Sequence, residues 1–166
     1  MNIIINTTDL LNETDVLIEN RIQFLNTKRN ITMDGEFTKL LFVTEHFSTD
    51  SLFLRFPVQL IVDPRITSKS ESVKRQMVLN PNSTNQSVIT NFTELEKQLL
   101  NYYKKYKNIN KHSIMLLNNN LLTGNIKLFT SSNNNDKNKK YAIKISGIWE
   151  SYENIGMTYK IIEVEY

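Results

Sequence analysis

Cysteine is absent from this chain, and glycine and proline are scarce, with four and three residues among 166. The lack of cysteine excludes disulfides, cysteine-ligated zinc, iron–sulfur clusters and a thiol nucleophile. No phosphate-cradling loop of the G-x-x-x-x-G-K-[ST] type is present. No apolar run approaches the roughly 18 residues that a membrane-spanning helix requires. The first residues carry no pattern of a secretory signal, so we expect a protein that is not secreted and has no membrane partner.

Patterns typical of catalysis and metal binding are missing too. No G-x-S-x-G sequence occurs, and the acidic residues are scattered rather than paired. Glu45, His46 and Asp50 could each offer a metal ligand, but the other histidine, His112, is far away in sequence, and a metal site needs three or four convergent groups. We therefore expect no enzyme, no metal and no cofactor.

Length and composition favour one folded domain over residues 1–166. Hydrophobic residues make up 40% and charged residues 22%, which is ordinary for a globular protein. Residues 1–20 are predicted to form a short helix or an arm. Residues 131–140 are polar and lysine-rich, which predicts a mobile basic loop.

The net charge of +3 hides a strongly basic block. Residues 1–96 hold nine Lys and Arg against twelve Asp and Glu, whereas residues 97–144 hold ten Lys against Asp136 alone. Residues 145–166 hold one Lys against four Glu. A basic block of this size is typical of a surface that meets phosphates, although a solvated helix face with a lysine-rich loop gives the same pattern.

Residues 52–62 carry the clearest strand pattern. Every even position is apolar, and the odd positions include Phe53, Arg55 and Gln59. This alternation predicts a core face and an opposite face. Pro57 cannot donate to a sheet ladder, so we expect an edge strand or a bulge there.

Periodicity predicts one long helix and several further strands. Residues 91–107 combine a capping pattern at Asn91 and Glu94 with apolar residues at helical spacing, among them the tyrosines 102, 103 and 106, which we expect to pack in the core. The preceding residues 80–87 are predicted to be a loop. Further strands are expected at 21–25, 37–45, 73–79, 113–117 and 126–130, and a terminal hairpin pairs 141–149 with 157–164.

This order of elements predicts a mainly β protein of the α+β class. An OB-fold-like Greek-key barrel with one helix at about 91–107 has this layout. A β-sandwich with a capping helix is the alternative.

Aromatic residues on the strands are the candidates for base stacking. If Phe53 is exposed beside Arg55 and Gln59, it forms a stacking platform; if a second layer covers it, it belongs to the core. Trp149 shares strand parity with Ile143 and Ile145, which predicts a core position. Tyr141 has the same parity but lies next to lysines near the strand end.

Two stretches resemble a known group of proteins: residues 37–58, FTKLLFVTEHFSTDSLFLRFPV, and residues 144–161, KISGIWESYENIGMTYKI. They resemble small proteins of nucleocytoplasmic large DNA viruses, some of which are similar to the phage T7-type single-stranded-DNA-binding family, an OB-fold family. The resemblance covers about forty residues. It implies a replication or repair accessory that coats single strands, located in the host cytoplasm or in the virion.

Charge, strand pattern and resemblance together predict a non-catalytic protein that binds single-stranded DNA or RNA, and a homo-oligomer is compatible with this prediction. The alternative is a viral structural or interaction component, such as a minor virion protein, whose basic surface meets an acidic partner. The candidate nucleic-acid-binding residues are Phe53, Arg55, Gln59, Lys104, Lys105, Lys107, Lys111, Lys137, Lys139, Lys140, Tyr141 and Lys144.

Overall fold

A computed structural model describes residues 3–11, 16–31, 34–62, 73–130 and 139–164. The helices are α1 (Thr7–Leu11), α2 (Val16–Arg21), α3 (Ser83–Lys107) and α4 (Leu116–Thr123). The strands are β1 (Ile4–Ile5), β2 (Ile22–Phe24), β3 (Lys28–Asn30), β4 (Gly35–Val43), β5 (Ser48–Thr49), β6 (Leu52–Arg55), β7 (Leu60–Val62), β8 (Val73–Leu79), β9 (His112–Ile114), β10 (Asn125–Thr130), β11 (Lys140–Glu150) and β12 (Asn154–Val164). The chain is therefore mainly β with one long helix, as expected for the α+β class.

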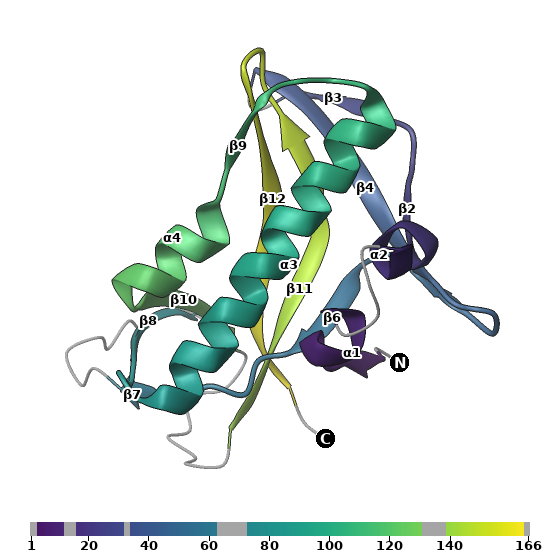
Figure 1. Cartoon of the computed structure of the whole chain (residues 1–166). Coiled ribbons are helices and arrows are strands. Elements are labelled where there is room, and N and C mark those ends of the chain that lie inside the picture. The colour runs from purple at the N-terminus through teal and green to yellow at the C-terminus, as the bar shows by residue number, and fades with distance from the viewer. Residues whose placement is uncertain (1–2, 12–15, 32–33, 63–72, 131–138, 165–166) are drawn as a thin grey trace.

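The hairpin of β11 and β12 is the centre of the sheet (Figure 1). A register shift between Ile145 and Gly147 divides β11 into two halves, of which the first pairs with β6 and the second with β4. On the other side, β9 and β10 pair in parallel with the two ends of β12. Within the described residues, the strand order β1-β6-β11-β12-β10-β8-β7 is a mixed sheet whose path does not close.

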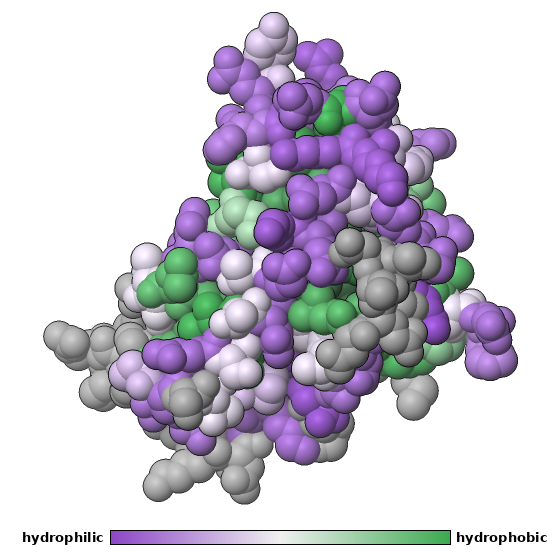
Figure 2. All heavy atoms as spheres, in the orientation of Figure 1, coloured by the Kyte–Doolittle hydropathy of each residue, from purple (hydrophilic) through white to green (hydrophobic). Residues whose placement is uncertain are grey.

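Helix α3 covers one face of this sheet and packs its apolar side into the core. It runs obliquely in front of β11 and β12 (Figure 1). Its side chains Phe92, Leu95, Leu99 and Tyr103 are almost completely buried. Burying each such side chain contributes about 1.5–3 kcal/mol. The surface over α3 is mostly hydrophilic (Figure 2), which agrees with a helix whose polar side faces water.

The helix begins at Ser83, eight residues before the predicted start, so the prediction of a loop over 80–87 is wrong from Ser83 onward. Asn82 is the N-cap, and its side chain accepts a hydrogen bond of 2.8 Å from the backbone N–H of Asn85. The polar Asn-Pro-Asn-Ser sequence is thus a helix start rather than a loop. The C-terminal end at Lys107 agrees with the prediction, and Asn108 closes the helix in a left-handed conformation.

The predicted strand over 52–62 is two strands, β6 and β7, with a break at residues 56–59. Pro57 lies in this break, in line with the expectation that it disturbs the ladder. The buried side chain of Asn85 holds the break, because its oxygen accepts from the Gln59 N–H at 2.9 Å and its nitrogen donates to the Gln59 carbonyl at 2.8 Å. The even positions Leu52 and Leu54 are buried in the core, as predicted.

Helix α4 occupies part of the segment predicted as a strand over 113–117, of which only β9 is extended. Glu96 of α3 caps this helix. Its carboxylate oxygens accept hydrogen bonds from the backbone N–H groups of Leu117 and Asn118 at 3.0 and 2.8 Å. A cap supplied by another helix leaves no sequence pattern next to α4 itself, which explains why the sequence does not reveal it.

The predicted strands at 21–25, 37–45, 73–79 and 126–130 correspond to β2, β4, β8 and β10, and the terminal hairpin is confirmed. In residues 1–20, the described part contains β1, α1 and α2. Among the described residues, no helix combines the length and the apolar character needed to cross a membrane.

Candidate nucleic-acid interface

The two faces of the central hairpin have different environments, and the bulge decides which residue lies on which face. Before the bulge, Ile143 and Ile145 are buried on the face toward α3. After the bulge, Ile148 is buried in the same core, so the alternation has shifted by one residue. Trp149 therefore lies on the opposite face and is only half-buried. The prediction that Trp149 shares the face of Ile143 and Ile145 is wrong for this reason.

On the face away from α3, here called the outer face, lysines from neighbouring strands form a row. Lys144 of β11 is opposite Phe53 of β6 on one side and Lys160 of β12 on the other. Leu128 of β10 pairs with Ile161, so the preceding residue, Lys127, is level with Lys160. We call Lys144, Lys160 and Lys127 the lysine row. Adjacent strands are about 4.8 Å apart, so the row brings three positive charges together across three strands.

Phe53 of β6 lies next to the lysine row, beside Lys144, but it does not form an exposed platform. Its side chain is 6% exposed, and the ammonium of Lys144 lies 5.5 Å from the ring centroid. Of the two alternatives for Phe53, the covered ring is the one the structure has. A buried ring beneath a lysine orients that lysine and is not available to stack on a base.

The neighbouring candidates divide between the two faces. Lys140 lies two residues before Ala142 on β11, so it is on the outer face, and it is exposed. Arg55 is exposed at the end of β6, where it lines a small hollow with Thr7 of α1 and Asn91 of α3. Tyr141 points to the core and is 8% exposed, so it does not stack bases at the surface. Gln59 lies in the break between β6 and β7, where its side chain accepts a hydrogen bond of 2.7 Å from Asn82.

The lysines at the end of α3 are held by local partners. Lys105 forms an ion pair of 2.8 Å with Glu19 of α2, and Lys107 donates a hydrogen bond of 2.9 Å to the Thr27 hydroxyl. Lys104 is partly buried in the last turn of the helix. This turn lies at the end of the molecule away from the start of β11 (Figure 1). The two lysine groups that the sequence joins into one basic block are therefore not neighbours in space.

Residues near the start of β11 complete the set of predicted lysines. Lys139 forms an ion pair of 3.0 Å with Glu163, and both side chains are largely buried. Lys137 and most of the predicted basic loop 131–140 lie outside the described residues.

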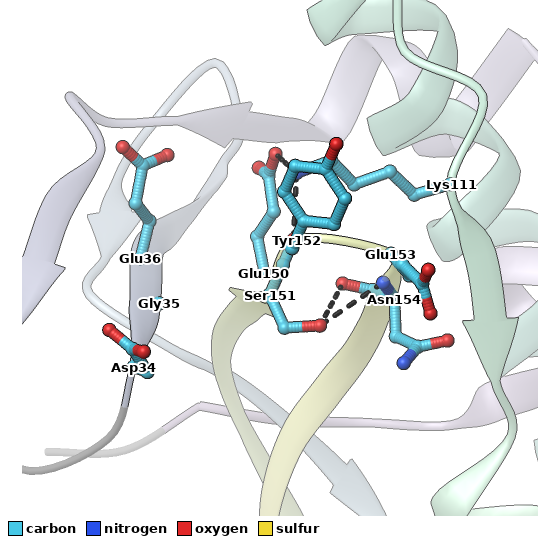
Figure 3. A pocket seen from close by; sticks show the side chains of 9 residues that line it. All are labelled: Asp34, Gly35, Glu36, Lys111, Glu150, Ser151, Tyr152, Glu153 and Asn154. Atoms are coloured by element: carbon cyan, nitrogen blue, oxygen red, sulfur yellow. Dashed lines mark hydrogen bonds and ion pairs between the residues drawn. The ribbon is translucent and has the colours of Figure 1, made fainter.

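Lys111 contributes to an acidic hollow, at the other end of the hairpin (Figure 3). The hollow has a volume of about 740 Å³, and its carboxylates come from Asp34, Glu36, Glu150 and Glu153. The ammonium of Lys111 contacts Glu150 and donates to the Ser151 carbonyl at 2.7 Å. Four carboxylates around one lysine disfavour a phosphate, so this end of the molecule is unsuited to a polyanion.

A buried hydrogen-bond chain keeps Glu150 charged. The Tyr103 hydroxyl lies 2.9 Å from a carboxylate oxygen of Glu150 and 2.9 Å from the Thr38 hydroxyl. Burial raises the pKa of Glu150, but the hydrogen bonds from Lys111 and Tyr103 outweigh this effect and leave the pKa below its ordinary value. Burial and the bond to Glu150 raise the pKa of Tyr103 to about 12. The chain ties α3 to β4 and β11, which is a structural role.

Comparison of the chain with protein families, with curated proteins and with solved structures finds no match in any of the three. Within the described residues, no three His, Asp or Glu side chains are placed to hold a metal ion together. The function of the protein is therefore inferred from the geometry of the outer face.

Sequence reasoning found Lys144 and Lys140 but missed Lys127, Lys160 and Trp149 on the same face. Lys160 lies in a segment with little local charge, and Lys127 lies in a short strand. Only the pairing register of β10, β11 and β12 brings them into one row. The alternation of β11 and β12 contained part of this signal, because a hairpin register follows from its turn.

Proposed function

We propose that this protein is a non-catalytic single-stranded-nucleic-acid-binding protein and that the outer face of its sheet is the binding surface. The observation that carries the proposal is the lysine row, in which Lys144, Lys160 and Lys127 come from three neighbouring strands. Lys140 adds positive charge to the same face.

Repulsion within the row supports an anionic ligand. Like charges directly opposite each other on neighbouring strands lower the stability of a sheet. Lys144 and Lys160 are such a pair. A strand of phosphates laid across the row reverses this repulsion and releases counterions, which gives affinity without dependence on sequence.

The position of Trp149 favours a single strand over a duplex as the ligand. It lies half-buried on the same face as the row, in a short hollow beside Lys160. Aromatic side chains on a basic sheet surface stack on unpaired bases, which a duplex does not expose. The resemblance of residues 37–58 and 144–161 to viral single-stranded-DNA-binding proteins supports the same function, a role in viral replication or repair and a barrel of the OB type.

The test is titration of a fluorescein-labelled oligothymidylate by anisotropy at several salt concentrations. Each phosphate neutralised on a single strand contributes about −0.7 to the slope of log K against log salt. If the row meets three phosphates, the slope is about −2 or steeper, and the triple variant Lys127→Gln, Lys144→Gln, Lys160→Gln should flatten it by about 2. A matching ribonucleotide strand compares DNA with RNA.

The matched control is the triple variant Lys97→Gln, Lys104→Gln, Lys105→Gln in α3. It removes the same net charge from the helix side of the molecule. Equal losses in the two triple variants would show that bulk charge, not the row, holds the strand. Absence of binding at low salt would overturn the proposal and favour the alternative of a structural or interaction protein.

A further inference from the structure

A notch opens in the sheet between β9 and β10, at the edge of β12. β9 pairs with β12 up to Gly156, and β10 pairs with it again from Ile161. Among the described residues, no strand pairs with the edge of β12 between these points.

Helix α4 bridges the notch and makes it rigid. Its first turn is capped by Glu96, and the side-chain amide of Asn120 donates a hydrogen bond of 2.6 Å to the Tyr159 hydroxyl of β12. Two leucines of α4, Leu116 and Leu122, are exposed. The surface in this region mixes hydrophobic and hydrophilic side chains (Figure 2). The opening has a volume of about 310 Å³, which is at the lower end of the range for small-molecule sites.

The lining of the notch combines an aromatic ring, an apolar floor and two cations. Trp149 borders it from the outer face, and the buried Met157 lies beneath. The indole rests on Gly156, because a Cβ atom at that position would lie 2.4 Å from the ring. Lys127 and Lys160, two members of the lysine row, complete the lining.

We propose that this notch binds one nucleotide of the strand, with the base stacked on Trp149 and the adjoining phosphate held by Lys127 and Lys160. The inference rests on the proposed function and deepens it, since it assigns a base-binding position to a surface otherwise defined by charge. An aromatic ring stacks on any base, so this position does not depend on the sequence of the strand.

Trp149 is the single tryptophan of the chain, so its fluorescence reports on the notch alone. The probes are an oligothymidylate and an oligonucleotide of equal length built from abasic units, which has the same phosphates and no bases. Both should bind, as measured by anisotropy of an end label. Only the oligothymidylate should quench Trp149.

Each outcome has a distinct meaning. If both probes bind and change the tryptophan fluorescence equally, or if both bind and neither changes it, the base site is overturned and the proposed function stays intact. Binding of neither probe overturns both. Quenching by the oligothymidylate alone supports both.

Variants test the same point through affinity. Trp149→Ala should weaken oligothymidylate binding about 10- to 100-fold and leave binding of the abasic strand within twofold. Trp149→Phe keeps a ring and should restore most of the affinity. Tyr152→Ala removes a tyrosine that is 93% exposed on the β11–β12 turn, and this matched control should bind like the wild type.

Equal weakening of both probes by Trp149→Ala would mean that the residue only supports the fold, and would overturn the inference. If that variant does not fold, the double variant Lys127→Gln, Lys160→Gln replaces it. It keeps Trp149 in place and should reduce the affinity for both probes while the quenching at saturation remains. If the saturated double variant shows no quenching, the base does not stack on Trp149 independently of the phosphate contacts, and this outcome would contradict the inference.

Discussion

Lys144 and Lys160 are direct partners across the central antiparallel hairpin, on the face that α3 does not cover. Two ammonium groups in this position repel each other, while the ring of Phe53 and the carboxylate of Asp50 both attract the ammonium of Lys144. Stability alone would favour a neutral or acidic residue at one of the two positions. The pair is thus a place where binding and stability have opposite requirements.

Lys127→Gln should weaken binding without destabilising the protein. Lys127 is exposed in the lysine row, so its replacement should change the free energy of unfolding by no more than about 0.5 kcal/mol. The slope of log K against log salt should become shallower by about 0.7. Urea unfolding and anisotropy titrations measure the two effects separately. An unchanged salt slope would remove Lys127 from the phosphate contacts.

Glu150 should make stability depend on pH in the acid range. Burial raises its pKa, but the hydrogen bonds from Lys111 and Tyr103 bring it below the ordinary value of 4.5. A carboxyl group whose pKa is lower in the folded state stabilises the fold above its unfolded pKa, and this contribution is lost as the pH falls through the folded pKa. Glu150→Gln should therefore be less stable than the wild type at pH 7, by about 1–3 kcal/mol.

The difference between the wild type and Glu150→Gln should begin to shrink as the pH falls below about 4.5, the ordinary pKa, and should be lost below the lower pKa of the folded state, where both side chains are neutral. Urea unfolding at a series of pH values from 3 to 7 measures it. Glu153→Gln, a change at an exposed neighbour, is the control and should follow the wild type throughout. A constant difference over the series would show that Glu150 is not held as an anion by its partners.

Gly156→Ala should displace the indole of Trp149. The added Cβ would lie 2.4 Å from two ring carbons, a distance at which one of the groups must shift. Overpacking of this kind costs about 1–3 kcal/mol. The tryptophan emission should also shift to longer wavelength, because the ring moves toward water. An unchanged spectrum and unchanged stability would show that the ring does not rest on Gly156.

Local patterns in the sequence were enough to predict most elements. Alternation predicted the terminal hairpin, and helical periodicity with the lysine-rich last turn predicted the end of α3 at Lys107. The start of α3 was missed because Pro81 and Asn82 are typical of loops as well as of helix N-termini.

The candidate site depends mostly on features that local patterns do not contain. The bulge after Ile145 reverses the face of Trp149, and its local sign is Gly147, because an isolated glycine within a strand is typical of a bulge or of a close backbone approach. The lysine row depends on pairing between strands that are not adjacent in sequence, namely β10 with β12. Net charge predicted a basic surface, but the partners Glu19 and Thr27, which come from near the N-terminus, hold lysines of α3 locally.

Phe53→Ala distinguishes a core ring from a stacking ring. Phe53 is 6% exposed and lies on β6, between β1 and β11. Removal of its ring should therefore lower the free energy of unfolding by about 3–5 kcal/mol. A stacking ring would instead leave stability unchanged and cost one to two decades of affinity.

Phe53→Leu keeps most of the apolar volume and serves as the matched variant. Its loss of stability should be smaller than that of the alanine variant, because it leaves a smaller cavity. Affinity for oligothymidylate should be measured well below the melting temperature of each variant, so that only folded protein contributes. Under these conditions the loss of affinity should stay within about threefold, since only the contact that orients Lys144 changes. A large loss of affinity with unchanged stability in Phe53→Ala would contradict the buried position and return Phe53 to the binding surface.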